Sequence, residues 1–219
     1  SRGGADYQIN RAVPLLFMLL AVSVAATALI LTLPRLVLGN RVPRARGVMR
    51  CLWYFIFIGV GYILIQVALV QKFVLFLGHP TYALTVIIFS MLLASGLGSY
   101  FSRRMVGASG ARLAVVLVLA AALVAALAAL LGRMPDAGMD WPLAGRCLAS
   151  VALIAPASFL MGIPFPTGLR RLEQRHAPSV RWAWSLNAAA SVMGSVAAVA
   201  LAIYVGLRET LLIGGGMYL

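Results

Sequence analysis

Long apolar runs alternate with short polar segments along almost the whole chain. A helix needs about 20 apolar residues to cross a hydrocarbon core of about 30 Å, and six runs are long enough, while a run that begins near Glu209 covers about half of that distance. The pattern predicts an all-α protein, a polytopic transmembrane helix bundle with six complete spans plus a truncated seventh. The predicted spans are residues 13–33, 51–77, 81–101, 113–131, 143–163, 182–205 and 209–219.

The composition supports the same class. Hydrophobic residues make up 63% of the chain and charged residues only 11%, which excludes an ordinary soluble domain. Residues 13–219 are predicted to form a single transmembrane helical domain, and residues 1–12 read as a linker or flank. The last run stops inside apolar sequence, which favours either a fragment of a longer chain or a disordered end.

The basic residues concentrate in short segments between the spans. Of the 18 basic residues, all but Lys72 are arginine, and this placement is typical of topology signals rather than of nucleic-acid binding. With an external N-terminus, eleven arginines lie on the cytoplasmic side of the membrane and five or six basic residues lie on the outer side. The positive-inside rule therefore predicts this orientation in a bacterial plasma (inner) membrane. Eight of the inner arginines are predicted to contact lipid headgroups, namely Arg41, Arg44, Arg46, Arg103, Arg104, Arg170, Arg171 and Arg175.

Three separated motifs occur in a fixed order between residues 48 and 219. They are QVALVQKFVLFLGHPTYALTVIIFSMLLASGLGS, MGIPFPTGLRRL, and WAWSLNAAASVMGSVAAVALAI followed by GLRETLLIGG. In these motifs the chain resembles the carboxy-terminal membrane region of bacterial spermidine-synthase-like integral membrane proteins. In that family a Rossmann-like domain, related to aminopropyltransferases and methyltransferases, accompanies the membrane helices.

The chain itself lacks the sequence signature of such a soluble domain. It has no glycine-rich strand-to-helix turn followed by an acidic residue about 20 positions later, so the nucleotide chemistry of the family has no residues here to carry it. If a soluble domain precedes Ser1, the charge distribution places it outside, where S-adenosylmethionine is not normally available. Either the orientation is then reversed or that domain is not a conventional transferase.

Polar side chains near the end of the second span form the candidate site. Lys72 lies in apolar helix, where a charge is costly to keep. Three interpretations stay open: the amine extends to the interface, the residues line an outer-half cavity or hold an anion, or they form a structural hydrogen-bond network. The His79-Pro80 pair also suits a compact turn between antiparallel helices. The predicted polar cluster comprises Gln66, Gln71, Lys72, His79, Tyr82 and, from the sixth span, Asn187.

Paired carboxylates, a serine-histidine-acid set and metal-ligand spacings cannot be assembled from this sequence. No catalytic residue, metal or cofactor is therefore predicted. The leading hypothesis is a noncatalytic integral membrane domain that anchors or scaffolds a soluble domain or a larger assembly, with the lipid bilayer and other membrane subunits as partners and no nucleic acid. The alternative is a transporter or half-transporter with a polar cavity between Gln66 and Tyr82. A membrane enzyme acting on a lipid-soluble substrate is the third hypothesis.

Overall fold

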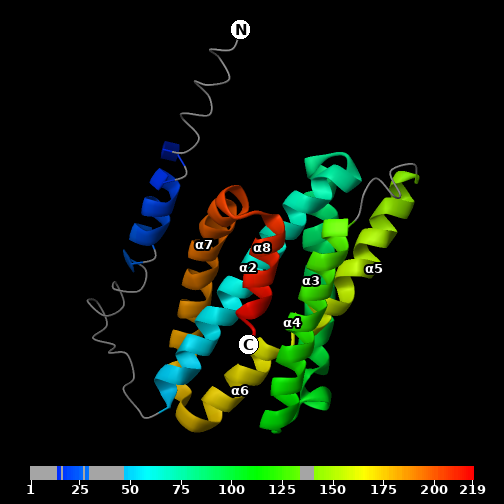
Figure 1. The fold of residues 1–219 in the computed structure, drawn as a ribbon. Helices are drawn as coiled ribbons and strands as arrows, with labels where there is room; N and C mark the ends of the chain where they lie inside the picture. The colour runs from blue at the N-terminus through cyan, green and yellow to red at the C-terminus, as the bar shows by residue number, and fades with distance from the viewer. Residues whose placement is uncertain (1–13, 16, 27, 30–46, 134–140) are drawn as a thin grey trace.

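The helices run roughly along one direction and form an elongated bundle (Figure 1). The structure, a computed structural model, describes residues 14, 15, 17–26, 28, 29, 47–133 and 141–219, and these ranges contain helices and turns but no strand. The elements are α2 (Val48–Leu77), α3 (Pro80–Met105), α4 (Gly110–Arg133), α5 (Leu143–Met161), α6 (Pro164–His176), the short 3-10 helix η1 (Ala177–Ser179), α7 (Val180–Tyr204) and α8 (Leu207–Gly216).

Four helical segments in the described residues are long and apolar enough to cross a membrane. They are Val48–Leu77, Pro80–Met105, Gly110–Leu131 and the continuous run Leu143–Tyr204, which contains α5, α6 and α7. The all-α prediction is confirmed for the described residues, whereas the count of six complete spans plus a seventh is not.

Three differences account for the lower count, and the first is that the predicted spans 143–163 and 182–205 both fall in the single run Leu143–Tyr204. The predicted span 13–33 lies partly outside the described residues, which contain only a shorter apolar helix there, Phe17–Ala26. Helix α8 has 10 residues and therefore covers about 15 Å, half of a hydrocarbon core. The predicted linker 1–12 lies outside the described residues.

The turn between α2 and α3 forms where the sequence predicts it. Gly78 adopts a left-handed conformation at φ 80°, and its N–H donates to the carbonyl of Val74 at 2.9 Å, which ends α2. His79 then caps α3, because its Nδ1 accepts from the N–H of Thr81 at 3.2 Å. Pro80 occupies the first helical position, where its missing N–H costs nothing. The predicted turn role of His79-Pro80 is confirmed.

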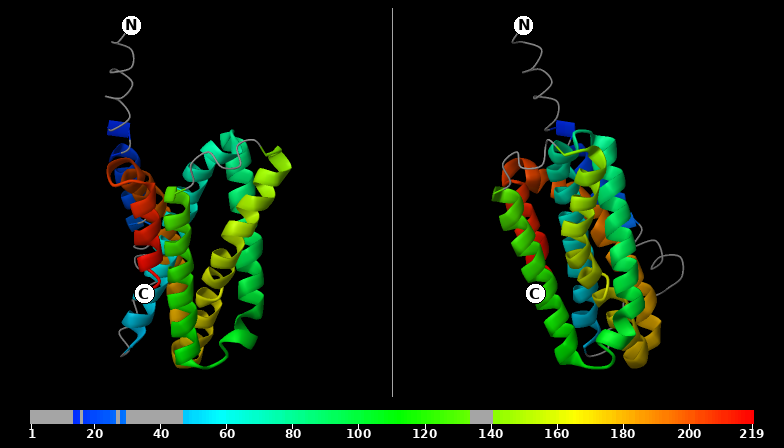
Figure 2. Two further views of the ribbon diagram at one scale, coloured as in Figure 1. Left: turned by 45° about the vertical axis from the view of Figure 1, so that its right-hand side comes forward. Right: turned by 90° about the vertical axis from the view of Figure 1, so that its right-hand side faces the viewer.

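Glycines allow two pairs of helices, α3 with α5 and α2 with α8, to approach to backbone contact. A Cβ placed on Gly98 of α3 would lie 1.9 Å from the carbonyl oxygen of Phe159 in α5, and one on Gly162 would lie 2.0 Å from the carbonyl oxygen of Ser95. In the same way a Cβ on Gly61 of α2 would lie 2.8 Å from the carbonyl oxygen of Gly214 in α8. Small residues at such crossings are the usual basis of helix association in lipid. Close backbone packing therefore holds α3 against α5 and α2 against α8. Figure 2 shows the arrangement of these helices from two further sides.

Helix α6 covers one end of the bundle, in a segment that the sequence shows only as a short basic stretch between two predicted spans. Gly162 ends α5, and Pro164 starts α6 at a position that favours proline. The hydroxyl of Tyr54 in α2 donates to the carbonyl of Pro164 at 2.8 Å, and Leu172 is fully buried. The basic residues thus lie on an amphipathic helix whose apolar side packs on the bundle. The segment between the predicted spans 143–163 and 182–205 is thus mostly helical, from Pro164 to His176.

Candidate functional site

A cavity lies between α2, α3, α7 and the end of α8, where α5 turns into α6. Its volume is about 370 Å³, and Leu92 and Gly96 at its edge are exposed on α3. We call it the central cavity. Its lining contains no charged residue, and its polar members are hydroxyl groups and one amide, namely Tyr62, Ser95, Ser99, Asn187, Ser191 and Tyr218.

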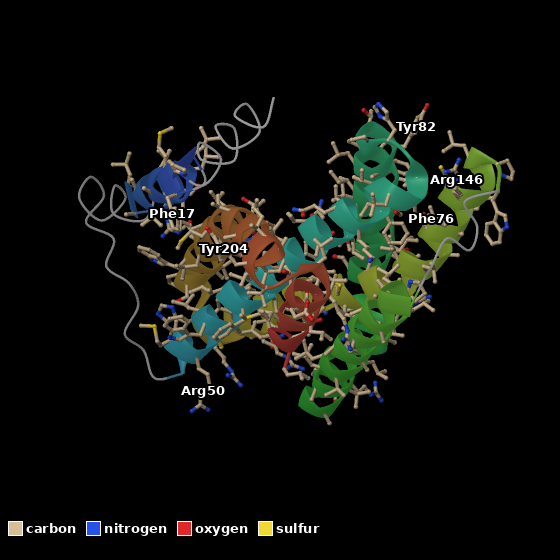
Figure 3. The ribbon with its side chains drawn as sticks, turned by 45° about the horizontal axis from the view of Figure 1, so that its top comes forward. Phe17, Arg50, Phe76, Tyr82, Arg146 and Tyr204 are labelled. Carbon is tan, nitrogen blue, oxygen red and sulfur yellow. The ribbon has the colours of Figure 1, made fainter. Side chains whose placement is uncertain are left out.

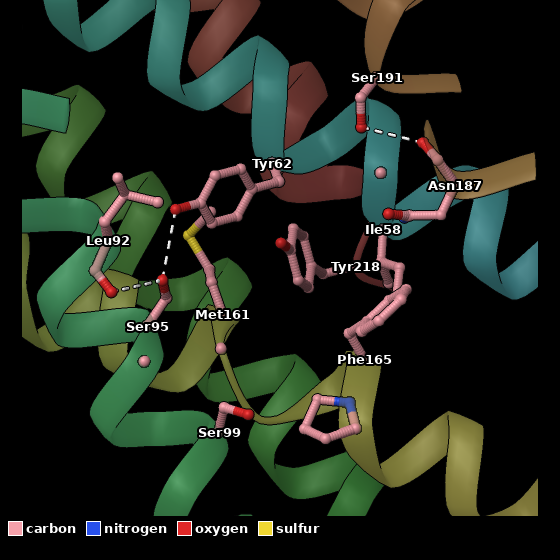
Figure 4. A pocket seen from close by; sticks show the side chains of 14 residues that line it. Ile58, Tyr62, Leu92, Ser95, Ser99, Met161, Phe165, Asn187, Ser191 and Tyr218 are labelled. Carbon is pink, nitrogen blue, oxygen red and sulfur yellow. Dashed lines mark hydrogen bonds between the residues drawn. The ribbon is translucent and has the colours of Figure 1, made fainter. Parts of the chain in front are cut away.

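Hydrogen bonds hold most of these polar groups at the cavity wall. The hydroxyls of Tyr62 and Ser95 lie 3.4 Å apart, and Ser191 donates to the carbonyl of Asn187 at 2.9 Å. Figure 4 shows these two pairs on opposite sides of the cavity with the ring of Tyr218 between them. The hydroxyl of Tyr218 makes no hydrogen bond within the described part of the chain, although the residue is only 3% exposed. The cavity therefore offers neutral donors and acceptors.

Asn187 is the one predicted site residue that lines the central cavity. Its Nδ2 donates to the carbonyl of Phe55 in α2 at 2.8 Å, and Gly59 makes room for this contact, since a Cβ there would lie 2.5 Å from the same nitrogen. The amide therefore ties α7 to α2. Its side-chain oxygen Oδ1, unlike the backbone carbonyl to which Ser191 donates, carries no hydrogen bond among the described residues and remains available to a ligand.

The other predicted members of the polar cluster lie elsewhere. Gln66, Gln71 and Lys72 are half-buried along α2, and none of them lines the central cavity. His79 and Tyr82 are exposed at the turn between α2 and α3, where their ring centres lie 5.7 Å apart. This turn lies about 36 Å along α2 from Phe55, at 1.5 Å per residue. The structure thus separates Asn187 from His79 and Tyr82.

Arg146 makes a long-range hydrogen bond at this turn, although the sequence did not single it out as a candidate. Its Nη1 donates to the carbonyl of Phe76 at 3.2 Å, near the end of α2. A guanidinium at a helix C-terminus satisfies a free carbonyl and suits the helix dipole. Its Nε is buried without a hydrogen-bond partner in the described residues. Figure 3 shows Arg146, Phe76 and Tyr82 together at one end of the bundle, far from Arg50. Only the fold reveals this pairing, because the partner is a backbone atom.

Arginine side chains gather at the α6 end of the bundle. Arg41, Arg44 and Arg46 fall outside the described residues. Arg104 and Arg175 are exposed. The remaining three predicted headgroup contacts, Arg103, Arg170 and Arg171, converge on a second cavity of about 260 Å³ between α6 and the turn that joins α3 to α4.

We call this second cavity the arginine cleft. Besides the three arginines, its lining comprises Gly107, Ala108, Thr167 and Gln174. The cleft brings together basic residues from two parts of the chain that the sequence showed only as separate clusters. A converging set of guanidinium groups can bind an anion.

No group of three or more histidine, cysteine or acidic side chains within the described residues could hold a metal ion. Comparisons with protein-family models, with curated proteins and with solved structures find no match for this chain.

Proposed function

We propose that this chain is a noncatalytic integral membrane domain of a spermidine-synthase-like protein, which anchors or scaffolds a soluble domain or a larger membrane assembly. The observation that carries the proposal is the glycine packing of the bundle. Backbone-to-backbone contact at Gly98, Gly162 and Gly61 favours a rigid support over a domain that must open and close. The order of the three sequence motifs supports the family assignment.

The distribution of charge supports a bacterial inner-membrane location with the N-terminus outside. Among the described residues, eight arginines lie at the α6 end, and only Lys72, Arg133, Arg146 and Arg208 lie toward the opposite end. An excess of arginine marks the cytoplasmic side of a bundle, so α6 faces the cytoplasm. In the finer topology that we propose, residues 13–33 and 209–219 contribute the first and the seventh span.

The anchoring function is tested in the full-length protein with a protease site inserted at Gly3-Gly4. Cleavage is expected to release a soluble domain that precedes the site from washed membranes in folded form, with whatever activity it has in the intact protein unchanged, while the chain from residue 5 stays in the membrane. An activity that disappears on release and returns when the membrane part is added back contradicts a noncatalytic role.

The central cavity favours a second function, the passage of a small neutral solute. Its hydroxyl and amide groups can bind polyols without the desolvation of a charge. This cavity is not the one predicted between Gln66 and Tyr82, since neither of those two residues lines it. Transport proteins commonly bind their substrates between helices near the middle of the membrane.

Glycerol uptake into proteoliposomes tests this second function. The transport hypothesis predicts faster swelling than in protein-free liposomes and a return to the protein-free rate in Gly96→Leu. Gly96 suits this test, because it lines the cavity while a Cβ at this position meets no atom within 4 Å. Gly110→Leu, at another glycine with no atom within 4 Å, is the matched control. Equal swelling with and without the wild-type protein rejects transport of glycerol.

A further inference from the structure

Two of the three guanidinium groups in the arginine cleft are held in place by hydrogen bonds to the protein. Arg170 donates from Nη1 to the hydroxyl of Ser102 at 3.2 Å and from Nη2 to the hydroxyl of Thr167 at 3.4 Å. Both hydroxyl-bearing residues are fully buried. Arg171 donates from Nη2 to the carbonyl of Ser109 at 2.7 Å. Two of the three arginines are therefore ordered before any ligand arrives, which reduces the entropy lost on binding.

The hydrogen bonds leave most of the binding capacity unused. A guanidinium carries five N–H donors, and the two bonds of Arg170 occupy only part of that set. Arg103 is exposed and makes no side-chain hydrogen bond to any described residue. All the N–H donors of the Arg103 guanidinium are therefore available to a ligand at the open side of the cleft.

The positive charge of the cleft has no protein counter-charge in the described residues. None of the lining residues is acidic. Glu173 belongs to α6 but does not line the cleft, and Glu209 lies at the start of α8, at the opposite end of the bundle. The charges of Arg103 and Arg171 both act unfavourably on the positive charge of Arg170. An anion in the cleft would relieve this repulsion.

We infer that the arginine cleft is a specific binding site for a phosphate group. Planar guanidinium forks match the oxygens of phosphate in paired hydrogen bonds, and three of them approach from α3 and α6. Thr167 and Gln174 add neutral polar groups to the lining. The phosphate comes either from a phospholipid headgroup or from a free phosphate ester. The inference goes beyond anchoring, because an anchor requires no particular site for an anion.

The sharpest test compares two neighbouring arginines. Arg103→Gln and Arg104→Gln remove the same charge from adjacent, exposed positions at the end of α3, but only Arg103 lines the cleft. A charge-assisted hydrogen bond contributes roughly 1.5–3 kcal/mol, and 1.4 kcal/mol corresponds to a factor of ten. Arg103→Gln is expected to weaken phosphate binding about tenfold, and Arg104→Gln less than about twofold. Melting curves in detergent should show that both variants are folded.

Calorimetric titrations of the purified chain in dodecyl maltoside separate the two phosphate sources. One probe is inorganic phosphate, and the other is dioleoylphosphatidylglycerol added to the same micelles, with dioleoylglycerol as the lipid without phosphate. Arg103-dependent binding of inorganic phosphate supports a free phosphate ester, and Arg103-dependent binding of the phospholipid alone supports a headgroup. Equal losses in the two variants, equal binding of dioleoylglycerol, or no binding of either phosphate probe at millimolar concentration overturns the inference. None of these results depends on whether the chain anchors a soluble domain.

Discussion

Gly98→Ala is the substitution whose effect follows most directly from the geometry of the bundle. The new Cβ would lie 1.9 Å from the carbonyl oxygen of Phe159 and 2.9 Å from its carbonyl carbon. Ordinary van der Waals contact begins at 3.4 Å, so α3 and α5 must separate locally by about 1.5 Å. The obstacle is backbone, which cannot rotate away as the end of a side chain could.

The separation has two costs. Overpacking of a filled interior typically costs about 1–3 kcal/mol. A gap of about 0.5–1 Å also forfeits a quarter to a half of each dispersion contact along the crossing, and Gly162 meets Ser95 at the same crossing. We expect Gly98→Ala to lower the free energy of unfolding by about 3 kcal/mol.

Gly96→Ala provides the matched control, two residues earlier in the same helix. A Cβ at Gly96 meets nothing within 4 Å, and alanine favours helix over glycine by about 1 kcal/mol. Unfolding of both variants by sodium dodecyl sulfate in mixed micelles, followed by circular dichroism and tryptophan fluorescence, measures the difference. If Gly98→Ala is as stable as Gly96→Ala, α3 and α5 do not cross at Gly98 and the proposed packing is refuted.

Three further substitutions test individual contacts by the same unfolding assay. Asn187→Leu keeps the side-chain size but removes the bond to the carbonyl of Phe55, and should destabilise the bundle by about 1 kcal/mol. Arg146→Met should cost about 1–2 kcal/mol, because the carbonyl of Phe76 at the end of α2 loses its side-chain donor. Lys72→Met should change stability by less than about 0.5 kcal/mol, since Lys72 makes no hydrogen bond or ion pair within the described residues.

Two controls separate contact loss from general effects of substitution. The hydroxyl of Ser185 bonds only to Arg181 in its own helix, so Ser185→Ala should be nearly neutral beside Asn187→Leu. Arg208 is exposed at the same end as Arg146, so Arg208→Met should be milder than Arg146→Met. A loss of more than about 2 kcal/mol in Lys72→Met would instead indicate a buried partner for its amine.

The positions of most helices could be predicted from the sequence, because each depends on a local apolar run. The predicted spans 51–77 and 81–101 correspond to Val48–Leu77 and Pro80–Met105, and the intervening turn follows from Gly78, His79 and Pro80. Helix α6 was missed because its length is below that of a span and its charges resemble a loop. Pro164 at its start and the leucines Leu169 and Leu172, three residues apart, are the sequence signals that could have revealed it.

The candidate sites depend on contacts between distant parts of the chain, and the sequence does not encode these locally. The partner of Asn187 is a backbone carbonyl 132 residues away, which no spacing rule could identify. Lys72 and His79 are seven residues apart, but they do not share a helix face, because α2 ends at Leu77 before His79 is reached. The arginine cleft likewise needs α6 to fold against the end of α3, so that Arg103 and Arg170 meet.

Sided labelling of two single-cysteine variants tests most directly whether the arginine-rich end of this membrane domain faces the cytoplasm. In a background with Cys51 and Cys147 replaced by alanine, Ala144→Cys reports on the first turn of α5 and Ala177→Cys on η1; both positions are exposed. In intact cells an impermeant maleimide should label position 144, and position 177 only after the membrane is permeabilised. Labelling of position 177 alone in intact cells would contradict the account and reverse the orientation of the bundle.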